Sequence, residues 1–244
     1  MELGEERLGG HAGQWTSVRP SFLVGLCVAL AATDGWAQPG DDNAITAYAG
    51  GRFVLRQASS GECVVALQGT VTRDATARFD DAVKKAYAMR CNEPLMFLLE
   101  SPGGLVLDAI DLAQRVRARG LRTIARYRCA SACALIFLGG VERVLWGSRA
   151  AIGLHQARDY DCDRFGTSLA THRMKDYLRD VVPATADPIF EIITGTSCES
   201  IAWIVGQRAI DLGIATKLEA PGVDVFGPET PDVCRNSPES VHRR

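Results

Sequence analysis

A run of five apolar residues at positions 95–99 most limits the folds open to this chain. Its lack of polar residues is typical of a strand that is buried on both faces of a parallel sheet. The chain turns at Gly103 and Gly104 directly afterwards, and apolar residues then recur at helical spacing over residues 106–116. A buried strand, a glycine turn and an amphipathic helix together predict one β-α unit of a layered α/β fold.

The same alternation continues along the chain. Further strands are predicted at residues 63–67, 121–127, 141–146 and 150–154, and further helices at residues 76–89, 131–138, 164–182 and 202–212. Repeated β-α alternation favours right-handed crossovers and a mostly parallel sheet. No internal repeat or linker divides residues 51–220, so we expect one α/β domain over that range.

The composition is that of a globular protein. Hydrophobic residues make up 47% and charged residues 23% of the 244 residues, which excludes a disordered or low-complexity chain. The formal net charge is −2 at pH 7. A dedicated nucleic-acid binder usually carries a large basic excess, so we expect no nucleic-acid partner.

Residues 1–37 have the layout of a secretory signal peptide. The apolar run at residues 22–32 is shorter than the roughly 20 residues of a membrane-spanning helix, so no stable span is expected after processing. Gly35 and Ala37 place small residues before a cut after Ala37. The alternative is a buried N-terminal helix. The stretch before the run is long and acidic for a signal peptide, which indicates a true start near Val18.

Removal of residues 1–37 leaves 207 residues, with 25 basic and 25 acidic side chains. Residues 38–50 and 221–244 are rich in Gly, Pro, Asp and Ser, and are predicted to be flexible ends. We expect a periplasmic or secreted protein with disulfides, because an exported chain meets an oxidising compartment. The odd number of remaining cysteines leaves at least one thiol free or paired between chains. These seven are Cys63, Cys91, Cys129, Cys133, Cys162, Cys198 and Cys234.

Three short segments carry residues suited to catalysis. Gly103 and Gly104 follow the buried strand, where backbone N–H groups can approach a ligand closely. Ser131 lies where a strand passes into an apolar helix, whose start can stabilise negative charge. His155 directly follows the predicted strand at residues 150–154 and could act as a rigidly held base. Each segment also has a structural alternative, namely a simple turn, an N-cap and a satisfied core histidine.

Together the three segments resemble those of the ClpP/crotonase superfamily, and within it the Clp-type serine peptidases. Residues 101–104 match the family's Ser-Pro-Gly-Gly turn, Ser131 its nucleophile at a helix start, and residues 155–156 its His-Gln pair. Ser131 follows Gly104 by 27 residues and precedes His155 by 24, which is close to the family's spacing. The resemblance covers about residues 60–220. It implies a ClpP/crotonase-like fold, a repeated β-β-α superhelix with a mostly parallel sheet.

The resemblance also implies a role for each residue. Ser131 would be the nucleophile and His155 its general base. The N–H groups of Gly104 and Ala132 would form an oxyanion hole, supported by the turn at Gly103. The implied activity is that of an exported serine hydrolase acting on peptide or protein substrates, with no metal and no cofactor. Relatives form trimers or heptameric rings, so a homo-oligomer is implied as well.

The chain departs from the family pattern at the acid that would orient His155. Counting back from Gly213 reaches Ile201, which cannot serve, and Glu199 is the residue we predict for this role. A dyad without an acid stays open, and so does a Ser-Lys dyad with Lys175. A catalytically weak or inactive crotonase-fold protein that binds a ligand or partner is the alternative function.

Cys129 and Cys133 lie on either side of Ser131. Disulfides from them, with Cys162 as one candidate partner, could pin the turn that carries Ser131. The alternatives are a reactive thiol, and a zinc site built from both cysteines and His155. The lack of a second matching cysteine pair disfavours the metal.

Two further patterns leave alternatives open. Cys63 and Cys91 flank a predicted strand-helix unit and could pair with each other. An arginine-rich stretch fits a solvated surface with salt bridges, and the alternative is a site for acidic groups or a subunit contact. Its members are Arg115, Arg117, Arg119, Arg122, Arg126 and Arg128.

Overall fold

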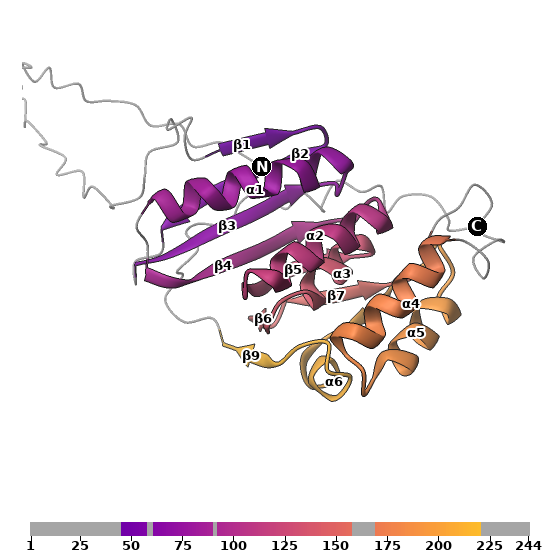
Figure 1. Ribbon diagram of the computed structural model, residues 1–244. Helices are drawn as coiled ribbons and strands as arrows, with labels where there is room; N and C mark the ends of the chain where they lie inside the picture. Colours follow the sequence, from indigo (N-terminus) through magenta and orange to yellow (C-terminus); the bar gives the residue numbers. More distant parts are fainter. Residues whose placement is uncertain (1–44, 58–60, 90–91, 158–168, 221–244) are drawn as a thin grey trace, which may run out of the picture. The chain divides into compact units, whose positions relative to one another are not determined.

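The computed structural model describes residues 45–57, 61–89, 92–157 and 169–220 (Figure 1). All the described residues belong to one compact unit. The predicted signal peptide and the predicted tail, residues 221–244, lie outside the described residues. Across the described ranges, no helix is both long enough and apolar enough to cross a membrane.

The strands of the described residues form one mixed sheet. They are β1 (Ile45–Tyr48), β2 (Gly51–Gln57), β3 (Glu62–Gly69), β4 (Asn92–Ser101), β5 (Arg122–Ala130), β6 (Glu142–Trp146), β7 (Ala151–Leu154), β8 (Ala202–Ile204) and β9 (Lys217–Glu219). The order is β1-β2-β3-β4-β5-β6-β9, and β7 pairs with both β5 and β8. All pairs from β3 to β9 along this path are parallel, as is β5 with β7. The mostly parallel sheet predicted from the sequence is therefore confirmed.

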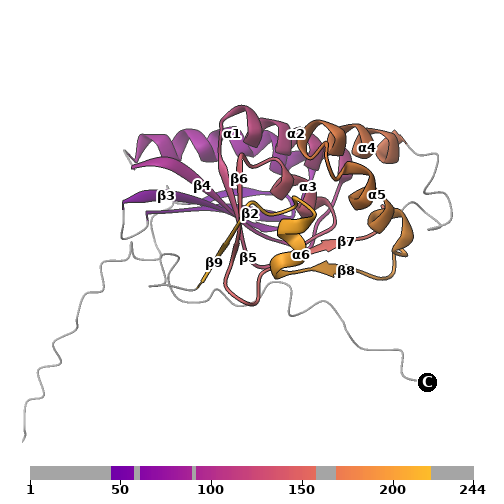
Figure 2. The same ribbon diagram turned by 90° about the horizontal axis from the view of Figure 1, so that it is seen from below.

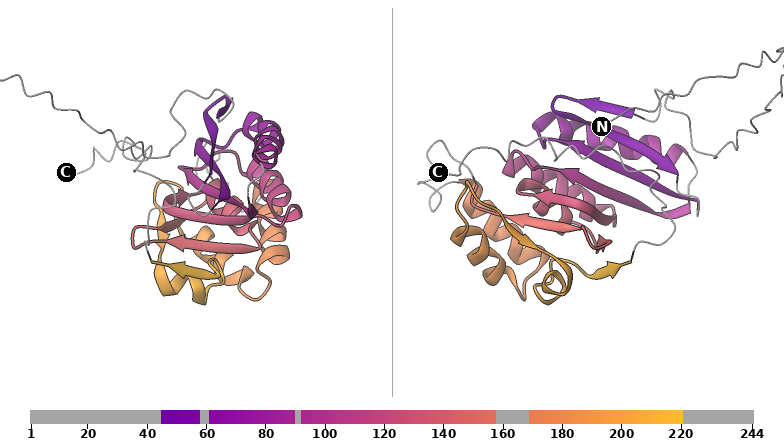
Figure 3. Two further views of the ribbon diagram at one scale, coloured as in Figure 1. Left: turned by 90° about the vertical axis from the view of Figure 1, so that its left-hand side faces the viewer. Right: turned by 180° about the vertical axis from the view of Figure 1, so that it is seen from behind.

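Helices connect the strands, and the three at residues 73–88, 106–118 and 169–181 form a layer over one face of the sheet (Figures 2 and 3). They are α1 (Arg73–Ala88), α2 (Val106–Ala118), α3 (Ala132–Leu138), α4 (Leu169–Val181), α5 (Ala186–Gly195) and α6 (Gly206–Asp211). Because side chains alternate along a strand, Phe97 and Leu99 of β4 join the main core with the helices, and Met96 and Leu98 join a second cluster. This explains why the run at residues 95–99 contains no polar residue.

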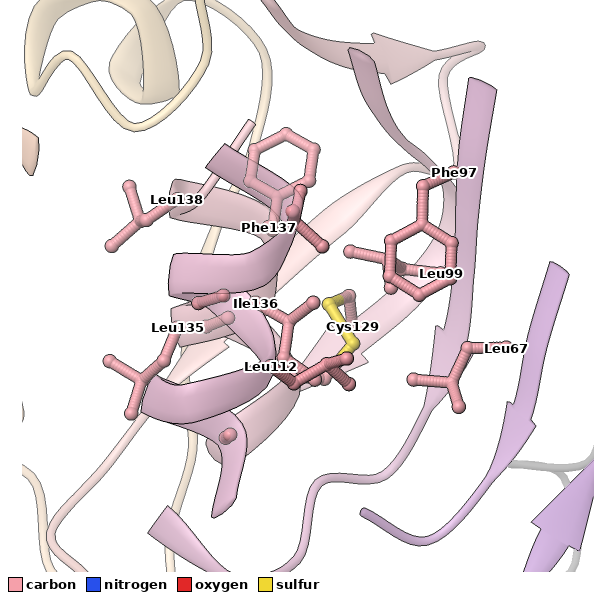
Figure 4. Packing of buried hydrophobic residues seen from close by; sticks show 14 of the residues in the cluster. Leu67, Phe97, Leu99, Leu112, Cys129, Leu135, Ile136, Phe137 and Leu138 are labelled. Carbon is pink, nitrogen blue, oxygen red and sulfur yellow. A yellow bond between two sulfur atoms is a disulfide. The ribbon is translucent and has the colours of Figure 1, made fainter. Parts of the chain in front are cut away.

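Helix α3 lies in the interior, and all seven of its residues are buried. Figure 4 shows its Leu135, Ile136, Phe137 and Leu138 among other labelled core side chains. The Tyr177 hydroxyl donates a hydrogen bond to the Leu135 carbonyl at 2.9 Å. A helix enclosed in this way has little freedom to move, so the residue at its start is held rigidly.

The structure corrects some of the predicted bounds. The expected flexible segment at residues 38–50 contains β1, which pairs with β2, and Lys85 Nζ donates to the Ile45 carbonyl at 3.2 Å. The predicted helix at residues 202–212 is divided into β8 and α6, because β8 pairs with β7. Helix α5 was not predicted.

The arginine-rich stretch forms salt bridges, as its simpler interpretation predicts. Arg115 and Arg119 of the α2 region contact the Asp80 carboxylate of α1 at 2.7 and 2.6 Å. Arg122 contacts Glu142 at 3.4 Å and also contacts Glu219, which ties β9 to the sheet. These pairs join neighbouring elements of the fold.

Candidate active site

Ser131 occupies the corner between β5 and α3, and its backbone conformation is unusual. Its φ is 57° and its ψ is −127°, and no other non-glycine residue in the described ranges has a positive φ. Such a conformation costs about 1–3 kcal/mol and persists only where the surrounding structure imposes it. The Ser131 N–H donates to the Gly153 carbonyl at 2.8 Å, and the Ser131 carbonyl accepts from the Ala134 N–H at 2.9 Å. The surrounding backbone thus fixes the corner from both sides.

The side chain of Ser131 makes no capping hydrogen bond to α3. An N-cap serine would use its hydroxyl to accept a bond from the first turn of the helix. The structure therefore does not support the alternative in which Ser131 only caps α3.

The glycine turn after β4 lies directly against Ser131. Gly103 has φ 106°, and a Cβ added there would lie 2.6 Å from the Ser131 Cβ and 3.1 Å from the Ala132 nitrogen. At Gly104, an added Cβ would lie 2.1 Å from the Val71 carbonyl oxygen. Val71 N–H donates to the Gly103 carbonyl at 2.8 Å. Only glycine fits both positions, so the turn brings bare backbone up to the serine.

Two N–H groups near this corner have no acceptor within the described part of the chain, those of Gly104 and Ala132. At the turn, the bridge to Val71 uses the Gly103 carbonyl and the Leu105 N–H and leaves the Gly104 N–H unused. Ala132 is the first residue of α3, where backbone donors have no partner inside the helix. Both groups are available to a ligand.

Ser131 and His155 line the same pocket. The other lining residues have apolar side chains and are Val106, Ala132, Leu135, Leu154, Ala157, Met174 and Ile193. The structure therefore brings together two residues that the sequence analysis identified separately. Met174 of α4 and Ile193 of α5 were not foreseen as pocket residues, because the position of these helices depends on tertiary packing.

His155 follows β7 and is partly buried. Burial lowers the pKa of its imidazole below the ordinary 6.5, and a smaller interaction with the Gln156 backbone opposes this. The side chain is therefore neutral at pH 7, which is the form that can accept a proton. Its Nδ1 atom is buried and has no hydrogen-bond partner among the described residues.

Gln156 anchors the end of β7 to the end of α5. Its N–H donates to the Thr196 carbonyl at 3.0 Å, and its Nε2 donates to the Thr194 carbonyl. These contacts fix the backbone next to His155. These contacts could not be predicted from the sequence because α5 has no recognised pattern, and the His-Gln pair at residues 155–156 is their one local indication.

Among the described residues, no acid lines the pocket with His155 or forms a hydrogen bond with its Nδ1. Glu199 is exposed, does not line the pocket, and its N–H donates to the Ser197 Oγ at 3.3 Å. The predicted role of Glu199 as orienting acid has no support from this geometry. The Lys175 ammonium lies 5.0 Å from the centre of the Phe190 ring and does not line the pocket either, so the Ser-Lys alternative is not supported.

Cys129 and Cys133 form a disulfide with each other. The candidate link from either cysteine to Cys162 is therefore wrong, and neither sulfur is available as a thiolate ligand for zinc. No group of three or more metal-ligating side chains occurs within the described ranges. Cys63 and Cys198 are disulfide-bonded as well, while Cys91, the predicted partner of Cys63, lies outside the described residues.

Comparisons with known proteins bear on the fold. Neither a protein-family model nor a curated protein matches the chain. Among solved structures, the chain is similar to a mutant of ClpP1 from Listeria monocytogenes, with a TM-score of 0.52 and 14% identity. This chain has a ClpP-like fold. The match covers 65% of this chain and 91% of ClpP1, and it confirms the α/β fold predicted from the sequence.

Proposed function

We propose that this protein is an exported serine hydrolase of the peptidase type, with Ser131 as nucleophile and His155 as general base. The observation that carries the proposal is the pocket that Ser131 and His155 line together. The strained backbone of Ser131 supports the same role, and so does the lack of a capping hydrogen bond from its side chain to α3. Export is supported by the signal-peptide layout of residues 1–37 and by the disulfide between Cys129 and Cys133.

The proposed reaction uses this chain's groups in order. Neutral His155 accepts the hydroxyl proton of Ser131 as its oxygen attacks the substrate carbonyl. The Gly104 and Ala132 N–H groups bind the oxyanion of the tetrahedral intermediate. His155 then gives the proton to the leaving amine, and water hydrolyses the acyl-enzyme by the same steps.

A fluorophosphonate probe tests this assignment, because it reacts with activated serine hydroxyls. We expect one probe molecule per chain, located on Ser131 by mass spectrometry of the digested protein. Protein denatured before exposure to the probe is the control and should carry no adduct. An adduct on another residue of the folded protein would contradict the assignment.

The rate of probe labelling is expected to rise with pH along a single titration curve whose midpoint lies below 6.5. Burial lowers the pKa of His155, and only the neutral imidazole can accept the serine proton. The rate should therefore be constant from neutral pH upward and fall only in the acid range. Initial labelling rates between about pH 5 and pH 8 measure this. A midpoint above 6.5 would show that His155 is not the titrating base.

Binding without hydrolysis is the second candidate function. It is favoured by one observation, the buried Nδ1 of His155 that no described residue contacts by a hydrogen bond. A triad histidine is normally held by a carboxylate at this atom. This candidate predicts no probe adduct on the wild-type protein, together with saturable peptide binding that Ser131→Ala leaves unchanged.

A further inference from the structure

The Cys129–Cys133 disulfide spans only four positions of sequence, with Ser131 at its centre. A cross-link that closes so short a loop constrains the unfolded chain less than one closing a long loop. Its main effect therefore falls on local geometry, at the corner between β5 and α3.

This disulfide lies where the parts of the candidate site converge. Cys129 pairs in register with Ser101 of β4 and with Ile152 of β7. Ser101 lies two residues before Gly103, and Ile152 lies three residues before His155. Cys133 belongs to α3, so the bond ties the helix of the proposed nucleophile to the strand between the glycine turn and the histidine.

Both cysteines are fully buried, with 0% exposure. Figure 4 shows the sulfur–sulfur bond among labelled side chains of the main core, which include Leu99 and Ile136. The surrounding core is closely packed, so the cross-link holds a fixed position. The strained backbone of Ser131 would relax toward ordinary angles if the corner could open.

We propose that the Cys129–Cys133 disulfide is a positioning element that holds Ser131 in its reactive conformation, so that reduction of this bond lowers the reactivity of the site. The inference rests on the proposed function of Ser131. Reduction by a dithiol such as dithiothreitol breaks the S–S bond and transfers two electrons and two protons to it. The protein gains two thiols, and the reagent becomes a cyclic disulfide.

The test compares fluorophosphonate labelling of the oxidised wild type, the dithiothreitol-treated wild type and the double variant Cys129→Ala/Cys133→Ala. We expect reduction and the double substitution each to slow labelling by about tenfold or more, while circular dichroism shows a folded protein. Dithiothreitol should have no further effect on the double variant. The matched control is Cys63→Ala, which breaks a different disulfide at a residue of β3, distant in sequence from Ser131. Its labelling rate should stay within about twofold of the wild-type rate.

Equal labelling rates for the wild type and the double variant would overturn the inference. So would a slowing by dithiothreitol that persists in the double variant, because another disulfide would then be responsible. If the double variant does not fold, reduced wild type with its thiols counted gives the same comparison. If oxidised wild type does not label at all, the proposed function fails, and crystal structures decide the inference separately. A Ser131 φ near 57° both in the oxidised wild type and in the Cys129→Ala/Cys133→Ala variant would then refute the inference.

Discussion

Replacing Ser131 by alanine is expected to abolish fluorophosphonate labelling and to lower the rate of peptide hydrolysis by about 10³-fold or more. The hydroxyl oxygen is the atom that would form the covalent bond, and no other described pocket residue carries a nucleophilic side chain apart from His155. The backbone strain at this position stays the same, because alanine and serine both carry a Cβ. Since the hydroxyl makes no capping bond, we expect unfolding free energies within about 0.5 kcal/mol of each other.

The matched control for this variant is Ser148→Ala, at an exposed serine in the turn between β6 and β7. It should label and hydrolyse at the wild-type rate. Urea denaturation of both variants separates loss of chemistry from loss of fold. If the Ser131→Ala protein still binds about as many probe molecules per chain as the wild type, the nucleophile lies elsewhere and the mechanism proposed above is wrong.

The residues of the candidate site could be predicted from the sequence because each follows a strand that a local pattern identifies. Gly103, Ser131 and His155 come after β4, β5 and β7, and these strands are parallel neighbours. Carboxyl ends of parallel strands lie at the same edge of a sheet, so residues far apart in sequence meet there. Local sequence patterns could therefore predict which residues form the candidate site, but not the distances between them.

Other parts depend on contacts that local pattern does not encode. Residues 202–204 form a strand of only three residues, too short for a periodic pattern, and become β8 by pairing with β7. The acid predicted for His155 was chosen near the position reached by counting along the chain, and counting cannot follow the path that the loops and helix α5 take. At the position reached by counting, Ile201 instead lies against Gly153, where an added Cβ would be 2.7 Å from the Ile201 Cγ2. Disulfide partners likewise follow from geometry, so Cys133 was found with Cys129 and not with Cys162.

Substitution of alanine for Gly103 is expected to destabilise the fold by about 3 kcal/mol or more and to eliminate probe labelling. Two independent costs add at this position. Its φ of 106° is strained for any residue with a Cβ, and that Cβ would overlap the Ser131 Cβ at 2.6 Å and the Ala130 carbonyl oxygen at 2.7 Å. The atoms in the way are backbone or the first side-chain carbon, so a rotamer change cannot relieve the overlap. Urea denaturation measures the loss of stability.

Gly195→Ala separates this effect from a general cost of losing glycine. An added Cβ at Gly195 meets no atom within 4 Å, and its φ is not positive, so the change in unfolding free energy should stay within about 1 kcal/mol. The informative quantity is the labelling rate of whatever Gly103→Ala protein remains folded at low temperature. If the glycine turn shapes the site, that folded fraction reacts far more slowly than the wild type. If it reacts at the wild-type rate per folded molecule, Gly103 serves the fold alone and the contact with Ser131 has no catalytic consequence.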